Sequence, residues 1–302
     1  MSLLPPLQAL ISFFSLVWGF IESDFLTFAV PHTAYGVFGA LSSVPLVVPK
    51  DSRSDIPSTA QILGRLPLVL IFNVANLVIV DCANQRNAMT EDKLNKPWRP
   101  IPSGRITPDQ TRRLMLALMP LVQVLNYLLG AWEQGVLFTV LIWMYNDLGG
   151  GDEMIVREIL LSVAFAVLNH ASLAVAVGPG YSPLCPVGLV WTGICAGVIL
   201  TTIQVQDLKD QAGDRMRGRK SICLSIGDNF SRTTIAAFVC FWSCVCGYFW
   251  DLGLLAFSML LVVGAVVVLR VLVVRSPRGD AKTWKLWCFW HAVLYALPVL
   301  SN

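Results

Sequence analysis

Two polar segments of the sequence combine oxygen ligands with bases in a pattern that suits metal and phosphate binding. The first segment covers residues 81–105 and the second covers residues 207–220, and each mixes Asp with several Arg and Lys residues. Clustered carboxylates repel one another unless a cation lies between them, and hard oxygen ligands with open positions suit Mg²⁺ that bridges to phosphate oxygens. The interleaved bases can neutralise the phosphate charge that the metal leaves. Together the segments predict a site for Mg²⁺ and a diphosphate group.

Helical spacing indicates which side chains of these segments act together. Asp210 and Asp214 are four residues apart, so on a helix they share one face, and Asn84 and Asp92, eight residues apart, share another. Both pairs can face one cavity. We therefore expect the metal ligands to be Asn84, Asp92, Asp207, Asp210 and Asp214. The bases expected to hold the diphosphate are Lys93, Arg99, Arg215, Arg219 and Lys220.

An ordinary explanation competes with this one, in which acids and bases of two surface loops form ion pairs at a membrane boundary. For a single loop the two explanations are balanced. Two loops, each at the mouth of an apolar stretch and each with ligands at helical spacing, favour the binding site. Ionisable groups at membrane depth are costly and usually face a functional cavity.

The elements that carry these segments are predicted to be membrane-spanning helices. Of the 302 residues, 55% are hydrophobic and 14% are charged, about half the charged fraction of a soluble domain. A helix of about 20 apolar residues crosses a bilayer and satisfies its own backbone groups there. Nine apolar stretches approach this length, at residues 25–48, 60–82, 110–131, 134–147, 156–178, 185–206, 232–250, 253–274 and 283–300.

The ends of these stretches predict the orientation of the chain in the membrane. Residues 1–24 have no basic start of the kind that a signal peptide needs, so we expect an interfacial N-terminal segment ahead of one transmembrane domain at 25–302. Nineteen of the 22 basic residues lie in or beside the even-numbered loops, and cytosolic loops concentrate Lys and Arg. The N-terminus and both polar segments are therefore predicted to face the cytosol.

Further patterns bear on the fold and on classes of function that can be set aside. The second and sixth stretches each run into a polar segment, which suggests two similar four-helix halves followed by a last helix. The eight cysteines lie mostly in apolar stretches and are interpreted as packing residues. A net charge of +3 does not favour a nucleic-acid partner. No P-loop or dinucleotide-binding glycine pattern is present in the sequence.

The two segments resemble the motifs of a known family. Asp92-Lys-Leu-Asn-Lys-Pro-Trp-Arg-Pro-Ile-Pro-Ser-Gly-Arg105 and Asp207-x2-Asp210-x3-Asp214-Arg-x2-Gly-Arg-Lys220, in this order and with this number of spans, are similar to the UbiA superfamily of intramembrane prenyltransferases. The resemblance covers nearly the whole chain. It implies an all-α polytopic membrane fold with nine helices around a central cavity, in which two aspartate-rich motifs bind an isoprenoid diphosphate through Mg²⁺.

One departure from the family pattern narrows the expected activity. The usual first motif is Asn-Asp-x2-Asp-x3-Asp, whereas this chain has Asn84-Gln85-x2-Ala88-x3-Asp92. Such a motif resembles the UbiA-type terpene cyclases, which cyclise the prenyl chain. The resemblance implies a class I cyclisation of a linear prenyl diphosphate, expected to be geranylgeranyl diphosphate, with Asp92, Asp210 and Asp214 as catalytic metal ligands. In a eukaryotic source the membrane would be an internal one such as the endoplasmic reticulum.

A cation formed in this way needs a dry, aromatic-lined cavity, because aromatic faces attract cations and water would quench the intermediate. The residues considered for the cavity wall are Trp143, Tyr145, Asn146, Phe165, His170 and Trp191. Each could equally be a packing, interfacial or interhelical residue.

Two other functions remain open from the sequence. The first is transfer of the prenyl group to an aromatic or lipid acceptor, which uses the same ionisation with a second substrate. The second is transport or lipid binding, in which the charged loops would serve as gates.

Overall fold

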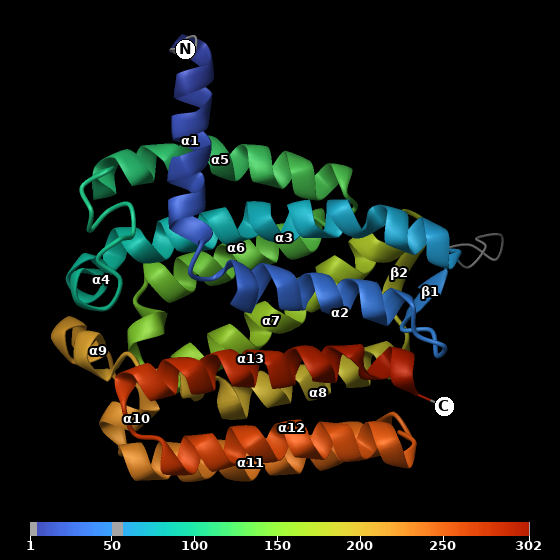
Figure 1. Cartoon of the computed structure of the whole chain (residues 1–302). Helices are drawn as coiled ribbons and strands as arrows, with labels where there is room; N and C mark the ends of the chain where they lie inside the picture. Colours follow the sequence, from blue (N-terminus) through green and yellow to red (C-terminus); the bar gives the residue numbers. More distant parts are fainter. Residues whose placement is uncertain (1–4, 50–56, 302) are drawn as a thin grey trace.

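The computed structural model describes residues 5–49 and 57–301, which form a helical bundle (Figure 1). Its longer helices run roughly along one direction, and the short helices α4 and α9 lie at the same end of the bundle. The helices that correspond to the nine apolar stretches are η1 with α2 (Phe25–Ala29 and Val30–Ala40), α3 (Thr59–Asn87), α5 (Pro108–Leu128), α6 (Trp132–Asn146), α7 (Met154–Val177), α8 with η3 (Pro186–Thr202 and Ile203–Gln206), α11 (Asp228–Phe249), α12 (Leu254–Val273) and α13 (Pro277–Leu300).

Length and composition support membrane spanning for much of this bundle. Within the described residues, five spans are long and apolar enough to cross a membrane, namely α3, α7, α8 with η3, α11 and α12. Helices α2 and α6 are shorter, with 11 and 15 residues. The all-α polytopic fold expected from the sequence is confirmed.

The first predicted span, residues 25–48, was too long. Helix α2 ends at Ala40, and the chain then forms a loop and the short strand β1 (Val47–Pro49). This strand pairs antiparallel with β2 (Tyr181–Leu184) at the end of the bundle opposite α4 and α9 (Figure 1). An apolar run does not by itself show where a helix ends, and in β1 Val47 is only partly buried while Val48 and Pro49 are exposed.

The N-terminal helix α1 (Pro5–Ile21) lies across the direction of the long helices and projects beyond α5 (Figure 1). Residues 7–21 make an angle of 64° with residues 25–40. Several large apolar side chains of α1 are exposed, among them Phe14 and Trp18. The attached end of α1 is held by Gln85, which donates from Nε2 to the carbonyl oxygen of Phe20 at 2.8 Å. The interfacial placement of residues 1–24 stays a prediction, and residues 1–4 lie outside the described part of the chain.

Helix α3 carries the first polar segment to the end of the bundle. Ser58 and Gln61 form a capping box that fixes where α3 begins. Its 29 residues span about 44 Å, which exceeds a hydrocarbon core of about 30 Å. Helix α3 is therefore longer than a bilayer crossing needs. The short helix α4 (Met89–Asn95) follows at once.

Two hydrophobic clusters make up the core. One joins α8, α11, α12 and α13, and the other joins α1, α3, α5 and α6, while α2 and α7 contribute to both. All eight cysteines are free, and five of them are buried as packing residues. Cys240 and Cys244 are instead exposed on α11, because this helix packs through its other face.

Candidate active site

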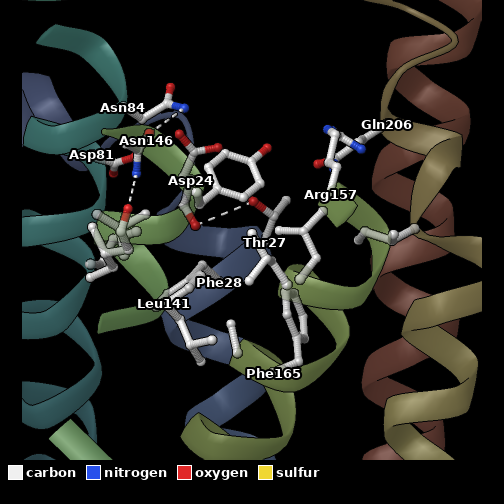
Figure 2. Close-up of a pocket in the computed structure, with 18 of the residues that line it drawn as sticks. Asp24, Thr27, Phe28, Asp81, Asn84, Leu141, Asn146, Arg157, Phe165 and Gln206 are labelled. Carbon is white, nitrogen blue, oxygen red and sulfur yellow. Dashed lines mark hydrogen bonds between the residues drawn. The ribbon is translucent and has the colours of Figure 1, made fainter. Parts of the chain in front are cut away.

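A cavity of about 200 Å³ opens between the two clusters, with one polar and one apolar end (Figure 2). Asp81, Asn84 and Asn146 gather on one side of the polar end, and Arg157 and Gln206 lie on the other. Below them the wall is apolar. Its aromatic members include Phe28, Phe138 and Phe165. The cavity thus offers a charged binding region directly above a hydrocarbon-lined space.

The first polar segment contributes an amide and a buried carboxylate. Asn84 lines the cavity and donates to Asn146 Oδ1 at 3.5 Å. Asp92 on α4 is 2% exposed and accepts two hydrogen bonds of 3.1 Å from Nη1 of Arg99. Arg99 also lines the cavity, so it links Asp92 to the ligand space.

The second polar segment begins where η3 ends, at Asp207. This buried carboxylate accepts from both Nη atoms of Arg157, at 2.7 and 3.0 Å. Asp210 lines the cavity and pairs with Lys209. Asp214, on α9 (Gln211–Arg217), is fully buried. It accepts from Nη1 of Arg219 at 2.8 Å.

The two segments meet through α4 and α9. Glu91 on α4 forms ion pairs with Arg217 and Arg219, at 3.3 and 3.4 Å. Gly213 on α9 packs so closely that a Cβ there would lie 2.3 Å from Nδ2 of Asn95. Two acidic segments about 120 residues apart therefore share one end of the bundle, as the metal-site hypothesis requires.

Burial changes the acidity of these carboxyls. It raises the pKa of Asp207 to about 7 and that of Asp214 to about 7, with Arg157 and Arg219 respectively opposing the shift. Burial also raises the pKa of Asp92, against the charge of Arg99. For Asp24, burial is outweighed by the charges of Lys96 and Arg99, which hold its pKa below the ordinary value. Acids that are costly to ionise without a cation are suited to a site that a metal completes.

The oxygen donors of the protein suit Mg²⁺ only when oxygen atoms of a bound ligand complete the coordination of the metal. Among the described residues, no three His, Cys, Asp or Glu side chains are grouped closely enough to hold a metal. Three buried carboxylate oxygens of the described residues nevertheless lack a hydrogen-bond partner, namely Oδ2 of Asp81, Oδ2 of Asp214 and Oε2 of Glu158. Mg²⁺ usually binds one or two carboxylates together with water and substrate phosphates, which matches this donor set.

The structure separates the predicted phosphate-binding bases into two groups. Arg99 and Arg219 line the cavity. Lys93, Arg215 and Lys220 do not, because they are exposed on the outer faces of the loops, and Lys220 pairs there with Glu153. For these three residues the expected position is corrected. A helix as short as α4 or α9 presents one side to the cavity and the other to solvent.

The predicted cavity wall is also divided. Tyr145, Asn146 and Phe165 line the cavity. Trp143, on the outer face of α6, is 53% exposed, and Trp191 is buried against Phe249 and Trp250. His170 lines a separate hollow with Glu133. Trp143, His170 and Trp191 were therefore wrongly expected at this cavity.

Other cavity residues were not selected from the sequence. They include Asp24 at the start of η1, Lys96 after α4, Arg157 in the first turn of α7 and Gln206 at the end of η3. The sequence could have indicated Arg157 as a cavity residue, since it is a lone base at the start of an apolar stretch. No such indication exists for Asp24, because nothing in the sequence shows that α1 turns back over α3.

Comparison with known proteins agrees with this architecture. The model of the UbiA prenyltransferase family matches residues 54–293. The chain therefore belongs to the UbiA prenyltransferase family, whose members are membrane enzymes acting on prenyl diphosphates.

Particular relatives have cyclase and synthase names. The chain is 27% identical to diterpene cyclase eriG of Hericium erinaceus, over 95% of this chain and 88% of that protein. It is 26% identical to the fumagillin beta-trans-bergamotene synthase of Aspergillus fumigatus, over 64% of this chain and 70% of that protein. It is 31% identical to a digeranylgeranylglyceryl phosphate synthase of Ignicoccus hospitalis, over 49% of this chain and 50% of that protein.

A solved structure shares the fold. The UbiA homologue of Archaeoglobus fulgidus bound to GPP and Mg²⁺ superposes with a TM-score of 0.64 at 12% identity, covering 93% of this chain and 99% of that one.

Proposed function

We propose that the protein is a class I terpene cyclase that ionises a linear prenyl diphosphate, geranylgeranyl diphosphate in particular, and cyclises the resulting cation. Inorganic diphosphate is the second product. The observation that carries the proposal is that positions 85 and 88, where the usual family motif has carboxylates, are occupied by Gln85 and Ala88. Gln85 is wholly buried and its amide bonds to Phe20, and Ala88 is buried too, so neither position offers a carboxylate to the cavity. The similarity to a diterpene cyclase along 95% of the chain supports the same choice.

The polar end would bind the diphosphate with Mg²⁺ held by Asn84, Asp207 and Asp210, which line the cavity. The other two expected ligands, Asp92 and Asp214, do not line it and are paired with Arg99 and Arg219, which do. Bound Mg²⁺ would neutralise charge on the departing diphosphate. Arg99 and Arg219, which line this end, stabilise the charge that develops as the bond between C1 and oxygen breaks. The electron pair of that bond leaves with the diphosphate.

The apolar end controls what the cation does next. An internal alkene of the same chain supplies the electron pair that closes the ring, and the released diphosphate accepts a proton from an adjacent carbon, which yields a neutral hydrocarbon. Phe28, Phe138 and Phe165 exclude water from this space and present aromatic faces to the cation. The polar loops face the cytosol in this proposal, and a eukaryotic source would place the protein in the endoplasmic reticulum.

The test is incubation of the purified protein with Mg²⁺ and either farnesyl or geranylgeranyl diphosphate, without an acceptor, followed by mass analysis of extracted hydrocarbons. A cyclic C20 hydrocarbon supports the proposal. Product that forms only after an aromatic or lipid acceptor is added would instead establish the transferase function.

Two substitutions distinguish an enzyme from a transporter. Asp210→Ala and Asp214→Ala should nearly abolish diphosphate release, whereas Asp109→Ala should not, because Asp109 is exposed on α5. Full diphosphate release by both site variants would reject catalysis at this site.

A further inference from the structure

A second pair of carboxylates, Asp24 and Asp81, lies at the polar end of the cavity, outside the two recognised motifs. Asp81 is on α3, three residues before Asn84, so both side chains occupy the same face of the helix. Asp81 is 4% exposed, and its Oδ2 has no hydrogen-bond partner. Asp24 is its acidic neighbour (Figure 2). Arg99 and Lys96 already offset the charge of Asp24, but the buried Oδ2 of Asp81 is left without a partner, which is costly unless a cation or a donor lies beside it in the cavity.

Asp24 is held firmly in this position from two sides. Its Oδ2 accepts from Nη2 of Arg99 at 2.6 Å and from the hydroxyl of Ser23 at 2.9 Å. The hydrogen bond from Gln85 to Phe20 secures the helix that leads into Asp24. The amide at position 85 thus replaces a carboxylate and also anchors the chain segment that brings another carboxylate to the cavity.

The partners of Asn84 complete the donor set. Its Nδ2 points to Oδ1 of Asn146 at 3.5 Å, which leaves its own carbonyl oxygen as an acceptor at the cavity. Two carboxylates and one amide oxygen, with water and a diphosphate oxygen, are a ligand set that Mg²⁺ or Mn²⁺ accepts.

We propose that Asp24, Asp81 and Asn84 bind a divalent cation at the polar end of the cavity, in place of the carboxylates missing at positions 85 and 88. The proposal rests on the function proposed above, since it assigns the metal ligands of that same site. It makes α1 and the turn after it part of the binding site, rather than a membrane attachment alone.

Binding of Mn²⁺ tests this assignment directly. The full chain in lipid nanodiscs is titrated with Mn²⁺ alone and again with Mn²⁺ and inorganic diphosphate, and free Mn²⁺ is measured by electron paramagnetic resonance. Asp81→Asn and Asp24→Asn should each weaken binding at one site by at least about tenfold, because each removes a charged ligand. Asp109→Asn, which removes an exposed carboxylate outside the cavity, is the matched control and should bind as the wild type does.

Asp81→Glu keeps the carboxylate, and should bind Mn²⁺ more tightly than Asp81→Asn. If Asp81→Asn does not fold, as judged by its thermal unfolding, Asp24→Asn and Asp81→Glu decide the question. Wild-type affinity and stoichiometry in both Asp→Asn variants would overturn the proposal.

The two proposals fail in different ways. If the wild-type protein cyclises geranylgeranyl diphosphate but neither Asp24→Asn nor Asp81→Asn changes Mn²⁺ binding, the metal-site proposal fails and the proposed function stands. If the wild-type protein releases no diphosphate but Asp81→Asn weakens Mn²⁺ binding, the proposed function fails and the metal-site proposal stands.

Discussion

Arg219 in the second polar segment lies 3.4 Å from Glu91 in the first. The same Nη1 atom of Arg219 donates to Asp214 at 2.8 Å, so one guanidinium joins a carboxylate from each segment. This contact places the two acidic segments over a common cavity. Its integrity depends on how closely α4 and α9 approach each other.

The approach of α9 to α4 can be disturbed at Gly213. In Gly213→Ala the new Cβ would lie 2.3 Å from Nδ2 of Asn95 and 3.0 Å from Cγ of Glu91, so these side chains, or α9 with them, must shift. We expect diphosphate release to fall by up to about 100-fold, since a displacement near 1 Å can cost this much. Steady-state release from geranylgeranyl diphosphate measures the effect. Gly193→Ala, with no atom within 4 Å of its Cβ, is the control and should leave the rate unchanged.

Arg157 should contribute strongly to stability, because it neutralises two buried acids. It pairs with Asp207 at 2.7 Å and with Glu158 at 3.0 Å, and all three side chains are at most 5% exposed. Arg157→Met would leave unpaired charges and should lower the free energy of unfolding by about 3–5 kcal/mol. Chemical denaturation in detergent micelles measures the change.

The control for this prediction is Arg112→Met, which breaks an exposed ion pair with Asp109 and should cost at most about 1 kcal/mol. Adding Asp207→Asn to Arg157→Met should recover part of the loss. Equal destabilisation by Arg157→Met and Arg112→Met would contradict the prediction.

The stability of the metal-free protein should depend on pH through Asp207 and Asp214. Both carboxyls have a folded pKa of about 7, above the ordinary value of 3.8. Such groups bind protons more tightly in the folded state, so their contribution is complete below pH 3.8 and is lost as the pH rises to about 7. The unfolding midpoint without Mg²⁺ should therefore fall over this range.

Added Mg²⁺ should reverse this trend, because the metal binds the deprotonated carboxylates. Its stabilising effect should grow between about pH 6 and 8, and calorimetry in two buffers should detect protons released on binding. Asp207→Asn and Asp214→Asn should flatten both pH profiles. A metal effect that is independent of pH in the wild type would exclude this linkage.

The aromatic wall should influence the product more than the ionisation. Phe165 lines the apolar end of the cavity, away from the carboxylates. Phe165→Leu removes an aromatic face of the cation cavity, so the ratio of cyclic products should shift while diphosphate release falls by less than about tenfold. Gas chromatography with mass detection measures the ratio. Trp143→Leu alters an exposed aromatic residue of α6 and should leave the product ratio as in the wild type.

Much of the fold could be predicted from the sequence, because each apolar stretch satisfies its own backbone hydrogen bonds as a helix. The two polar segments were also evident, since Asp210 with Asp214 and Asn84 with Asp92 combine oxygen ligands at helical spacing. The end of α2 was misplaced because hydropathy does not show where a helix ends when the apolar run continues into a loop and a short strand.

The tertiary structure decided which of many similar side chains reach the cavity. Arg99 and Arg219 face it while Lys93 and Arg215 face solvent, because α4 and α9 each turn one side inward. Asp24 enters the site because α1 is tied to α3 by the hydrogen bond from Gln85. Composition and local spacing therefore determined a helical membrane protein with two acidic segments. The choice of ligands depended on packing between helices far apart in the chain, which no local pattern encodes.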